Sequence, residues 1–144
     1  MTAFPPIVDL VPHTPPTLAL DELVDWSDGS AHARAVVRDD GLLVRDGAAD
    51  TVVCLEYMAQ TVAACLGYGA FRGGVGVRVG MVVACRKFSV TRPRITVGER
   101  LDIRVTRLRA TDDISSFDGE VRDERGEPVA NATMTLVHAE KPPA

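Results

Sequence analysis

The sequence predicts an α+β domain in which one long central helix is wrapped by a six-stranded antiparallel sheet, in the chain order β-β-α-β-β-β-β. Three observations lead to this prediction. One long apolar segment without proline lies in the middle of the chain. Two segments before it and four after it are rich in β-branched residues and partly alternate between apolar and polar positions. With 144 residues and no repeat or linker, the chain is expected to form a single domain, residues 1–144.

The first part of the chain is expected to be an extended arm followed by two strands. Five of the nine prolines lie within the first sixteen residues, so residues 4–16, FPPIVDLVPHTPP, should form a stiff arm instead of a helix. Two strands are predicted next, at residues 17–26, TLALDELVDW, and at residues 30–38, SAHARAVVR. The tripeptide SDG between them is typical of a turn.

The central helix is predicted at residues 51–71, between a turn-like RDGAAD and a glycine-rich GYGAFRGG. Asp50 or Thr51 can cap its start. Its candidate stops are four glycines, Gly67, Gly69, Gly73 and Gly74. At about 100° per residue, the only polar stripe ends in small residues and consists of Glu56, Gln60, Ala63 and Gly67. Because the other faces are apolar, we expect the rest of the protein to enclose this helix.

Glu56 is the one carboxylate in this segment, within the octapeptide CLEYMAQT. Enclosure would favour the protonated form of a carboxyl group, which can then donate a proton in a reaction. A buried glutamate can also serve the fold alone, through a backbone hydrogen bond or a place at a subunit interface. Glu56 is therefore a candidate general acid, with a structural role as the alternative.

Four strands are predicted after the helix, at residues 77–90, 99–110, 114–124 and 128–139. In the last of these, one face is expected to hold Ala130, Ala132, Met134 and Leu136. A hairpin turn is predicted at residues 124–128, ERGEP. The glycines of residues 72–80, RGGVGVRVG, follow a helix instead of joining a strand to a helix, so we expect a flexible connection and not a dinucleotide-binding loop.

Composition and charge argue against several classes of protein. A net charge of −4 and a pI near 5.3 are unlike those of nucleic-acid-binding proteins. The chain does not start with a basic stretch and an apolar run, and its long apolar segment is interrupted by polar residues, so we expect a soluble, cytoplasmic protein without a membrane span. No His or Cys cluster has metal-ligand spacing, and no metal is expected. Three cysteines without a CxxC pair are expected to be buried thiols, Cys54, Cys65 and Cys85.

Four motifs in order resemble those of the hotdog-fold 3-hydroxyacyl-[acyl carrier protein] dehydratases and cover nearly the whole chain. The family's opening PH motif and strand are matched by LVPHTPPTLALDELVDW, and its helix motif, an acidic residue followed by AQ, by CLEYMAQT. Its next strand pair is matched by RKFSVTRPRITVGERLDIRV, and its closing hairpin by FDGEVRDERGEPVANATMTLV. The shortened loop before the helix and the hexapeptide LEYMAQ most resemble those of the dehydratases of aryl-polyene pathways. The resemblance implies the hotdog fold and the conversion of a 3-hydroxyacyl thioester on an acyl carrier protein to the trans-2-enoyl thioester, in fatty-acid-like or aryl-polyene biosynthesis.

The resemblance places the catalytic histidine on His13 and the catalytic acid on Glu56. An imidazole can accept the C2 proton at neutral pH, and a carboxylic acid can protonate the departing C3 hydroxyl. His13 stands between prolines in VPHTPP, which would restrain its imidazole, and an ordinary surface-loop histidine is the alternative. His32 and His138 are expected on solvated faces.

The thioester oxygen also needs a hydrogen-bond donor, because the C2 proton is acidic only when the developing enolate is stabilised. Candidates are the backbone N–H groups at the helix start, those of Thr51, Val52 and Val53, and Gln60 is a candidate for the substrate pocket. The chain carries VRDGAAD where housekeeping members have a GHFPG loop, so the geometry of their donor does not carry over.

The expected partner is an acyl carrier protein, whose phosphopantetheine holds the substrate, and no other cofactor is expected. Candidates for attracting the acidic carrier and its phosphate are four cations, Arg86, Lys87, Arg92 and Arg94, and scattered surface charges at strand edges are the alternative reading.

The resemblance implies a two-fold homodimer or a higher oligomer of such dimers, with His13 of one subunit opposite Glu56 of the other. A heterodimer with a related hotdog subunit is also compatible with it. Two other functions stay open. A thioesterase of the same fold would use Glu56 to orient water or as a nucleophile, and a non-catalytic acyl-binding or assembly protein would need neither residue. The sequence does not indicate the acyl chain length or a preference for aryl or alkyl substrates.

Overall fold

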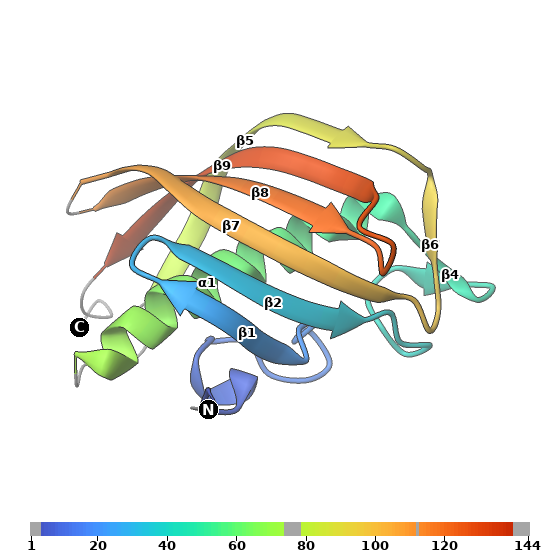
Figure 1. Ribbon diagram of the computed structural model, residues 1–144, viewed down its shortest axis with the longest axis horizontal. Coiled ribbons are helices and arrows are strands. Elements are labelled where there is room, and N and C mark those ends of the chain that lie inside the picture. Colours follow the sequence, from blue (N-terminus) through green and yellow to red (C-terminus); the bar gives the residue numbers. More distant parts are fainter. Residues whose placement is uncertain (1–3, 74–78, 112, 140–144) are drawn as a thin grey trace.

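A curved antiparallel sheet wraps around one long helix in the computed structural model, which describes residues 4–73, 79–111 and 113–139 (Figure 1). The predicted six-stranded sheet is confirmed, with the strand order β1-β2-β7-β8-β9-β5. Its strands are β1 (Glu22–Ser27), β2 (Ser30–Val36), β5 (Val79–Val90), β7 (Arg100–Ala110), β8 (Ile114–Arg122) and β9 (Pro128–Ala139). Strands β1 and β5 form the two edges.

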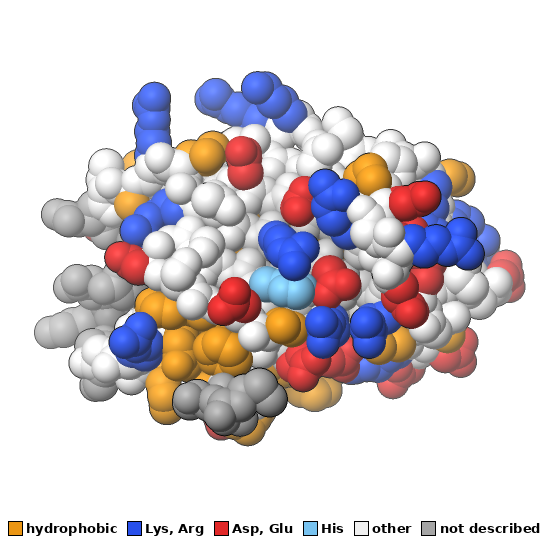
Figure 2. Space-filling view, viewed as in Figure 1, with side chains coloured by type: hydrophobic (Ala, Val, Ile, Leu, Met, Phe, Trp, Pro, Cys, Tyr) orange, Lys and Arg blue, Asp and Glu red, His pale blue; other side chains and the backbone are white. Residues whose placement is uncertain are grey.

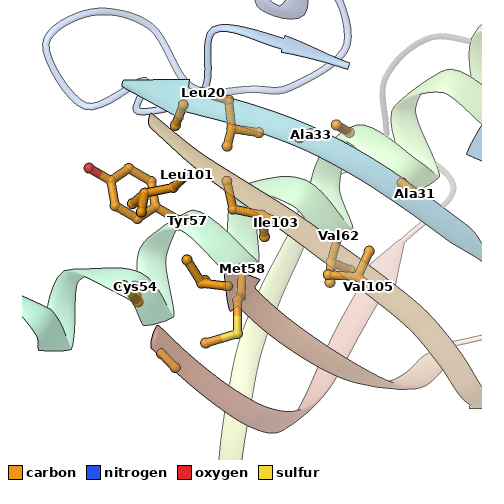
Figure 3. Close-up of a cluster of buried hydrophobic side chains, with 14 of the residues drawn as sticks. Leu20, Ala31, Ala33, Cys54, Tyr57, Met58, Val62, Leu101, Ile103 and Val105 are labelled. Carbon is orange, nitrogen blue, oxygen red and sulfur yellow. The ribbon is translucent and has the colours of Figure 1, made fainter. Parts of the chain in front are cut away.

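The core lies between α1 (Cys54–Arg72) and the inner face of this sheet. Met58 and Val62 of the helix lie against Ile103 and Val105 of β7 (Figure 3). The inner face of β2 carries only alanines, Ala31, Ala33 and Ala35, and the predicted inner face of β9 is confirmed, since Ala130, Ala132, Met134 and Leu136 are buried. A Cβ added at Gly119 of β8 would lie 2.8 Å from the Met58 sulfur. Small residues in the sheet therefore let α1 approach it closely.

A second, three-stranded sheet, which the sequence pattern does not predict, leads into the start of α1. Its order is β3-β4-β6, with β3 (Val44–Arg45), β4 (Ala48–Asp50) and β6 (Arg94–Thr96). The predicted turn in RDGAAD lies between β3 and β4, where Asp46 and Gly47 both have positive φ, 54° and 79°, as in the tight turn of a hairpin. These strands of two and three residues are too short to show an alternating pattern.

The helix begins later than predicted and ends before Gly73, one of its four candidate stops. A 3-10 helix, η2 (Thr51–Val53), precedes α1. The Asp50 side chain accepts a hydrogen bond from Val52 N, so Asp50 is the N-cap of η2. Two of the candidate stops, Gly67 and Gly69, lie inside α1, which ends at Arg72 with Gly73 as its C-cap. Most of the glycine-rich connection after it, residues 74–78, lies outside the described residues.

The N-terminal arm runs along the polar stripe of α1. It is not extended throughout, because residues Ile7–Asp9 form a 3-10 helix, η1. A Cβ at Gly67 would lie only 1.8 Å from the carbonyl oxygen of Leu10, so the arm contacts the helix backbone there. The stripe predicted from Glu56 to Gly67 is therefore the surface on which the arm lies.

The outer face of the sheet carries an ion-pair cluster, and basic and acidic side chains are interspersed on the face seen in Figure 2. His32 lies on this outer face as expected, but its side chain is only 13% exposed, and its Nε2 lies 2.7 Å from Asp102 Oδ1. Arg34 Nε donates to the same oxygen at 3.1 Å. Burial of Asp102 opposes ionisation, but the hydrogen bonds from His32 and Arg34 outweigh it, and the pKa of Asp102 is lowered. The side chain of His138 lies outside the described part of the chain.

Two of the three cysteines are buried as predicted. Burial raises the pKa of Cys54 to about 12 and that of Cys65 to about 11, so both thiols are held in their neutral form. Cys85 differs from the prediction and is exposed, because it lies on the edge strand β5. Among the described residues, no helix is long and apolar enough to cross a membrane.

Candidate active site

His13 and Glu56 meet at the start of α1. The Nε2 atom of His13 lies 3.6 Å from Oε1 of Glu56, which is longer than a hydrogen bond. Their side chains are 29% and 41% exposed, so both are open to solvent in part. Glu56 lies in the first turn of α1, and His13 comes from the proline-rich arm that crosses this turn. The two residues that the resemblance singled out are thus neighbours.

The environment of Glu56 differs from the sequence-based expectation. Enclosure of the helix by other structure is expected to desolvate this carboxylate, but in the single chain two fifths of its side chain is accessible. The reason is that the sheet covers one side of α1, while residues on the arm side of its first turns, Leu55, Glu56 and Ala59, are only partly buried. Glu56 can therefore be reached from outside the chain.

The imidazole of His13 presents one nitrogen to the site. Its Nδ1 atom is buried and has no hydrogen-bond partner among the described residues. The nitrogen that faces Glu56 is Nε2. The turn that follows His13 is fixed by hydrogen bonds to Thr14 O, from Thr17 N at 3.0 Å and from Leu18 N at 3.1 Å. Of the two imidazole nitrogens of His13, Nε2 is therefore the one placed to exchange a proton next to Glu56.

The two residues of the pair belong to the same chain. The resemblance implies His13 of one subunit opposite Glu56 of the other, whereas the structure brings the two residues together within one chain. The path of the arm along the helix explains the difference, since it carries His13 onto the first turn of its own α1.

Gln60 joins this pair to the arm. Its side chain is fully buried, and its Nε2 donates to Glu56 Oε1 at 2.9 Å and to Thr17 O at 2.8 Å. Its Oε1 accepts from Ala19 N at 2.8 Å. The amide is therefore engaged within the chain, which differs from its expected place in the substrate pocket.

The predicted backbone donors at the helix start are largely engaged. Thr51 N donates to Pro93 O at 3.0 Å, and Val52 N donates to Asp50 Oδ1 at 2.9 Å. This differs from the expectation that these groups are free, because the short β4–β6 pairing and the Asp50 cap take them up. Val53, the next residue of η2, stays a prediction. The Thr51 hydroxyl is buried and has no hydrogen-bond partner in the described part of the chain.

The four candidate carrier-binding cations fall into two groups. Arg92 pairs with Glu99 and lies 3.8 Å from Asp123, so it links three connections between strands. Arg94 donates to the carbonyl oxygens of Arg45 and Ala48, so it joins the strands of the small sheet. Arg86 and Lys87 are exposed on β5, and neither makes an ion pair with a described residue.

Sequence reasoning missed the backbone groups that hold the site. Thr17 O and Ala19 N bind the Gln60 amide, and Leu10 O fixes the arm at Gly67. The signal was present in the stripe Glu56, Gln60 and Gly67, which is polar or small because another segment of the chain lies on it. The pattern did not indicate that this segment is the N-terminal arm.

The arrangement suits proton transfer at two adjacent atoms of a bound molecule. An imidazole nitrogen can take a proton from one carbon while a neighbouring carboxylic acid protonates a hydroxyl group on the next carbon. Within residues 4–73, 79–111 and 113–139, no group of three His, Cys, Asp or Glu residues is placed to hold a metal ion.

Comparison with known proteins gives one family and several similar folds. A family model described as ApeP-like, ApeP dehydratase, matches residues 5–144. The dehydratase heterocomplex ApeI:P from Xenorhabdus doucetiae matches with a TM-score of 0.88 at 24% identity, over 94% of this chain and 92% of that chain. No curated protein matches the sequence.

Two other solved structures match with lower TM-scores. A hypothetical thioesterase with coenzyme A from Streptococcus pneumoniae TIGR4 has a TM-score of 0.64 at 15% identity, over 82% of this chain and 84% of that chain. The PaaI protein from the phenylacetic acid degradation operon of E. coli has a TM-score of 0.63 at 14% identity, over 82% and 78%. At these identities, the solved structures establish a shared fold alone.

Proposed function

The chain belongs to the ApeP-like dehydratases, the aryl-polyene family of hotdog-fold enzymes, and on that premise we propose that it dehydrates a 3-hydroxyacyl thioester carried on an acyl carrier protein. The product is the trans-2-enoyl thioester. The observation that carries this proposal is the approach of His13 Nε2 to Glu56 Oε1, 3.6 Å, at an accessible place on the start of α1.

In the proposed reaction, His13 is the base and Glu56 is the acid. Nε2 of His13 takes the proton from C2, and the electron pair of that bond forms the C2–C3 double bond. The C3–O bond breaks as Glu56 protonates the hydroxyl, and water leaves. His13 then holds a proton and Glu56 is a carboxylate. Proton exchange with water restores both groups, because both side chains are partly exposed.

The thioester oxygen and the carrier need further groups. Val53 N is the proposed donor to the thioester oxygen, since Thr51 N and Val52 N have partners. For the carrier, Arg86 and Lys87 are the proposed contacts, supported by their exposure and by the absence of ion pairs to described residues. The pantetheine of the carrier supplies the thioester, and no other cofactor is invoked.

A second hotdog subunit, identical or related, is proposed to complete the enzyme. The edge strand β5 is twelve residues long and is paired on one side only, with β9. Exposed strand edges of this length are commonly covered in native proteins. The accessible side of Glu56 and the half-buried residues around it support the same proposal. The similar structure from Xenorhabdus doucetiae is a heterocomplex.

The proposal is tested with a 3-hydroxyacyl-pantetheine thioester, followed by absorbance of the conjugated enoyl thioester and by a free-thiol reagent in parallel. Dehydration predicts a rise in enoyl absorbance without free thiol. Free thiol without enoyl absorbance would instead identify a thioesterase, and no change in either signal, with binding of the thioester, would identify an acyl-binding protein. A panel of aryl and alkyl substrates then gives the chain preference.

A further inference from the structure

Gln60 makes one hydrogen bond to the partner of His13 and two to the segment that follows His13. It donates to Glu56 Oε1 at 2.9 Å, donates to Thr17 O at 2.8 Å and accepts from Ala19 N at 2.8 Å. Its side chain is 0% exposed. These three bonds use the amide oxygen and both hydrogens of the amide nitrogen.

The backbone decides which way this amide points. Ala19 N–H can only donate, so it must face the Gln60 oxygen, and Thr17 C=O can only accept, so it must face the Gln60 nitrogen. The second hydrogen of that nitrogen is then directed at Glu56 Oε1. The orientation of Gln60 is thus fixed by the arm and not by Glu56, and it makes Gln60 an obligatory donor to Glu56.

We propose that Gln60 is a positioning residue that selects the oxygen of Glu56 from which the proton is given. Because Oε1 accepts the Gln60 hydrogen bond, the transferable proton lies on Oε2. When Glu56 gives up this proton, negative charge develops on its carboxyl group and the bond from Gln60 becomes stronger, which favours the transfer. Through Thr17 and Ala19, the same amide holds the segment next to His13 at a fixed distance from Glu56. This inference rests on the proposed function.

The first test compares Gln60→Glu with Thr61→Val. Gln60→Glu keeps the shape and can accept from Ala19 N, but when ionised it cannot donate to Glu56. Thr61→Val removes a hydrogen bond from the next buried side chain, whose Oγ1 donates to Tyr57 O at 2.8 Å, away from His13 and Glu56. We expect kcat of Gln60→Glu to fall about 10- to 100-fold above pH 7 with little change in KM, and Thr61→Val to keep its kcat.

The pH dependence separates positioning from a merely structural role. Among the described residues, the ionisable groups around the carboxyl group introduced by Gln60→Glu are Glu56 on α1, which bonds to Gln60, and His13 on the arm, which lies next to the same oxygen of Glu56. At lower pH, the introduced carboxyl group becomes protonated and can donate again, so the kcat of Gln60→Glu should recover toward the parent value as the pH falls. A kcat equal to that of the parent at every pH, or a loss that is the same at every pH, would overturn the positioning role.

A readout without catalysis keeps this inference separate from the proposed function. Amide hydrogen exchange at Ala19 should become faster in Gln60→Met, which has no acceptor for Ala19 N, and stay slow in Gln60→Glu and Thr61→Val. Unchanged exchange in Gln60→Met would show that Gln60 does not hold the segment after His13, even in a protein that turns out not to be a dehydratase. If the parent forms no enoyl product while exchange at Ala19 changes as expected, the proposed reaction is wrong, but the hydrogen bonds of Gln60 to the arm are confirmed.

Discussion

At the scale of single residues, the site depends on which polar atoms already have partners. Gln60 uses its whole amide within the chain, whereas Glu56 keeps Oε2 without any hydrogen bond to a described residue. His13 presents Nε2, because its Nδ1 is buried. The residues with free and accessible atoms are thus the two that the proposed reaction needs, and their buried neighbours hold them.

Thr51→Val should raise the free energy of unfolding by about 1 kcal/mol. The Thr51 side chain is 1% exposed and its hydroxyl has no partner in the described part of the chain, so a methyl group in its place removes a desolvation cost. Thr61→Val is the matched control and should lower stability by about 1 kcal/mol, because that hydroxyl donates to Tyr57 O. Urea unfolding measures both. Equal destabilisation by the two changes would show that the Thr51 hydroxyl does have a partner.

At the scale of elements, α1 supports the arm as well as the core. Its sheet side packs against β2, β7 and β8 (Figure 1). Its polar stripe contacts the residues around Leu10 and Thr17. The geometry at His13 therefore depends on contacts several helical turns away from it.

Gly67→Ala should destabilise the protein by about 1–3 kcal/mol and lower its activity. The new Cβ would lie 1.8 Å from Leu10 O, so the arm must shift, and His13 shifts with it. Gly69→Ala is the control in the same helix, because its Cβ would meet Trp26 at 3.6 Å, an ordinary contact, and it should be neutral or stabilising by up to about 1 kcal/mol. Thermal unfolding and dehydration rates are measured together. A fully active and stable Gly67→Ala protein would show that the arm does not depend on this contact.

The cluster between β2 and β7 predicts a pH-dependent contribution to stability. The pKa of Asp102 is lowered in the folded state, so its contribution is present above the unfolded pKa, about 3.9, and is lost as the pH falls through the folded pKa. Asp102→Asn should therefore lower the free energy of unfolding by about 1–2 kcal/mol at pH 7, and the difference from the parent should shrink toward pH 3.

The control for this prediction is Asp28→Asn. Asp28 lies 3.5 Å from Arg107, but its side chain is 87% exposed, so the change should have little effect at either pH. Urea unfolding at pH 7 and pH 3 gives the comparison. An Asp102→Asn difference that stays constant with pH would mean that its ionisation does not contribute.

At the scale of the whole molecule, the sequence predicted the main sheet, the helix and the two residues of the pair. The main sheet and the helix were predicted from long periodic segments. The buried face of β9 was predicted from its alternation of apolar and polar residues. The small sheet could not be predicted, because its strands have two or three residues. The placement of His13 and Glu56 in one chain could not be predicted either, since it depends on the path of the arm and on close approach at Gly67.

Because His13 and Glu56 meet within one chain, the activity of a dimer of wild-type and variant chains can be predicted. A dimer of one wild-type chain and one chain that carries both His13→Ala and Glu56→Gln should keep about half of the activity of a wild-type dimer, because the wild-type chain supplies both residues. Different tags on the two chains allow the mixed dimer to be isolated, and a wild-type dimer with the same tags is the control. Activity close to zero would mean that each site takes His13 and Glu56 from different subunits.

The most direct test of the account is the dehydration rate of His13→Ala, Glu56→Gln and the double variant, measured with the same 3-hydroxyacyl-pantetheine thioester. If the two residues act as one acid–base unit, each single change lowers kcat by about 10²- to 10⁴-fold, and the double variant is no slower than the slower single variant. All three proteins should stay folded, because both side chains are partly exposed. A folded single variant with nearly parental turnover would contradict the assignment of that residue, and with it the central role of the pair.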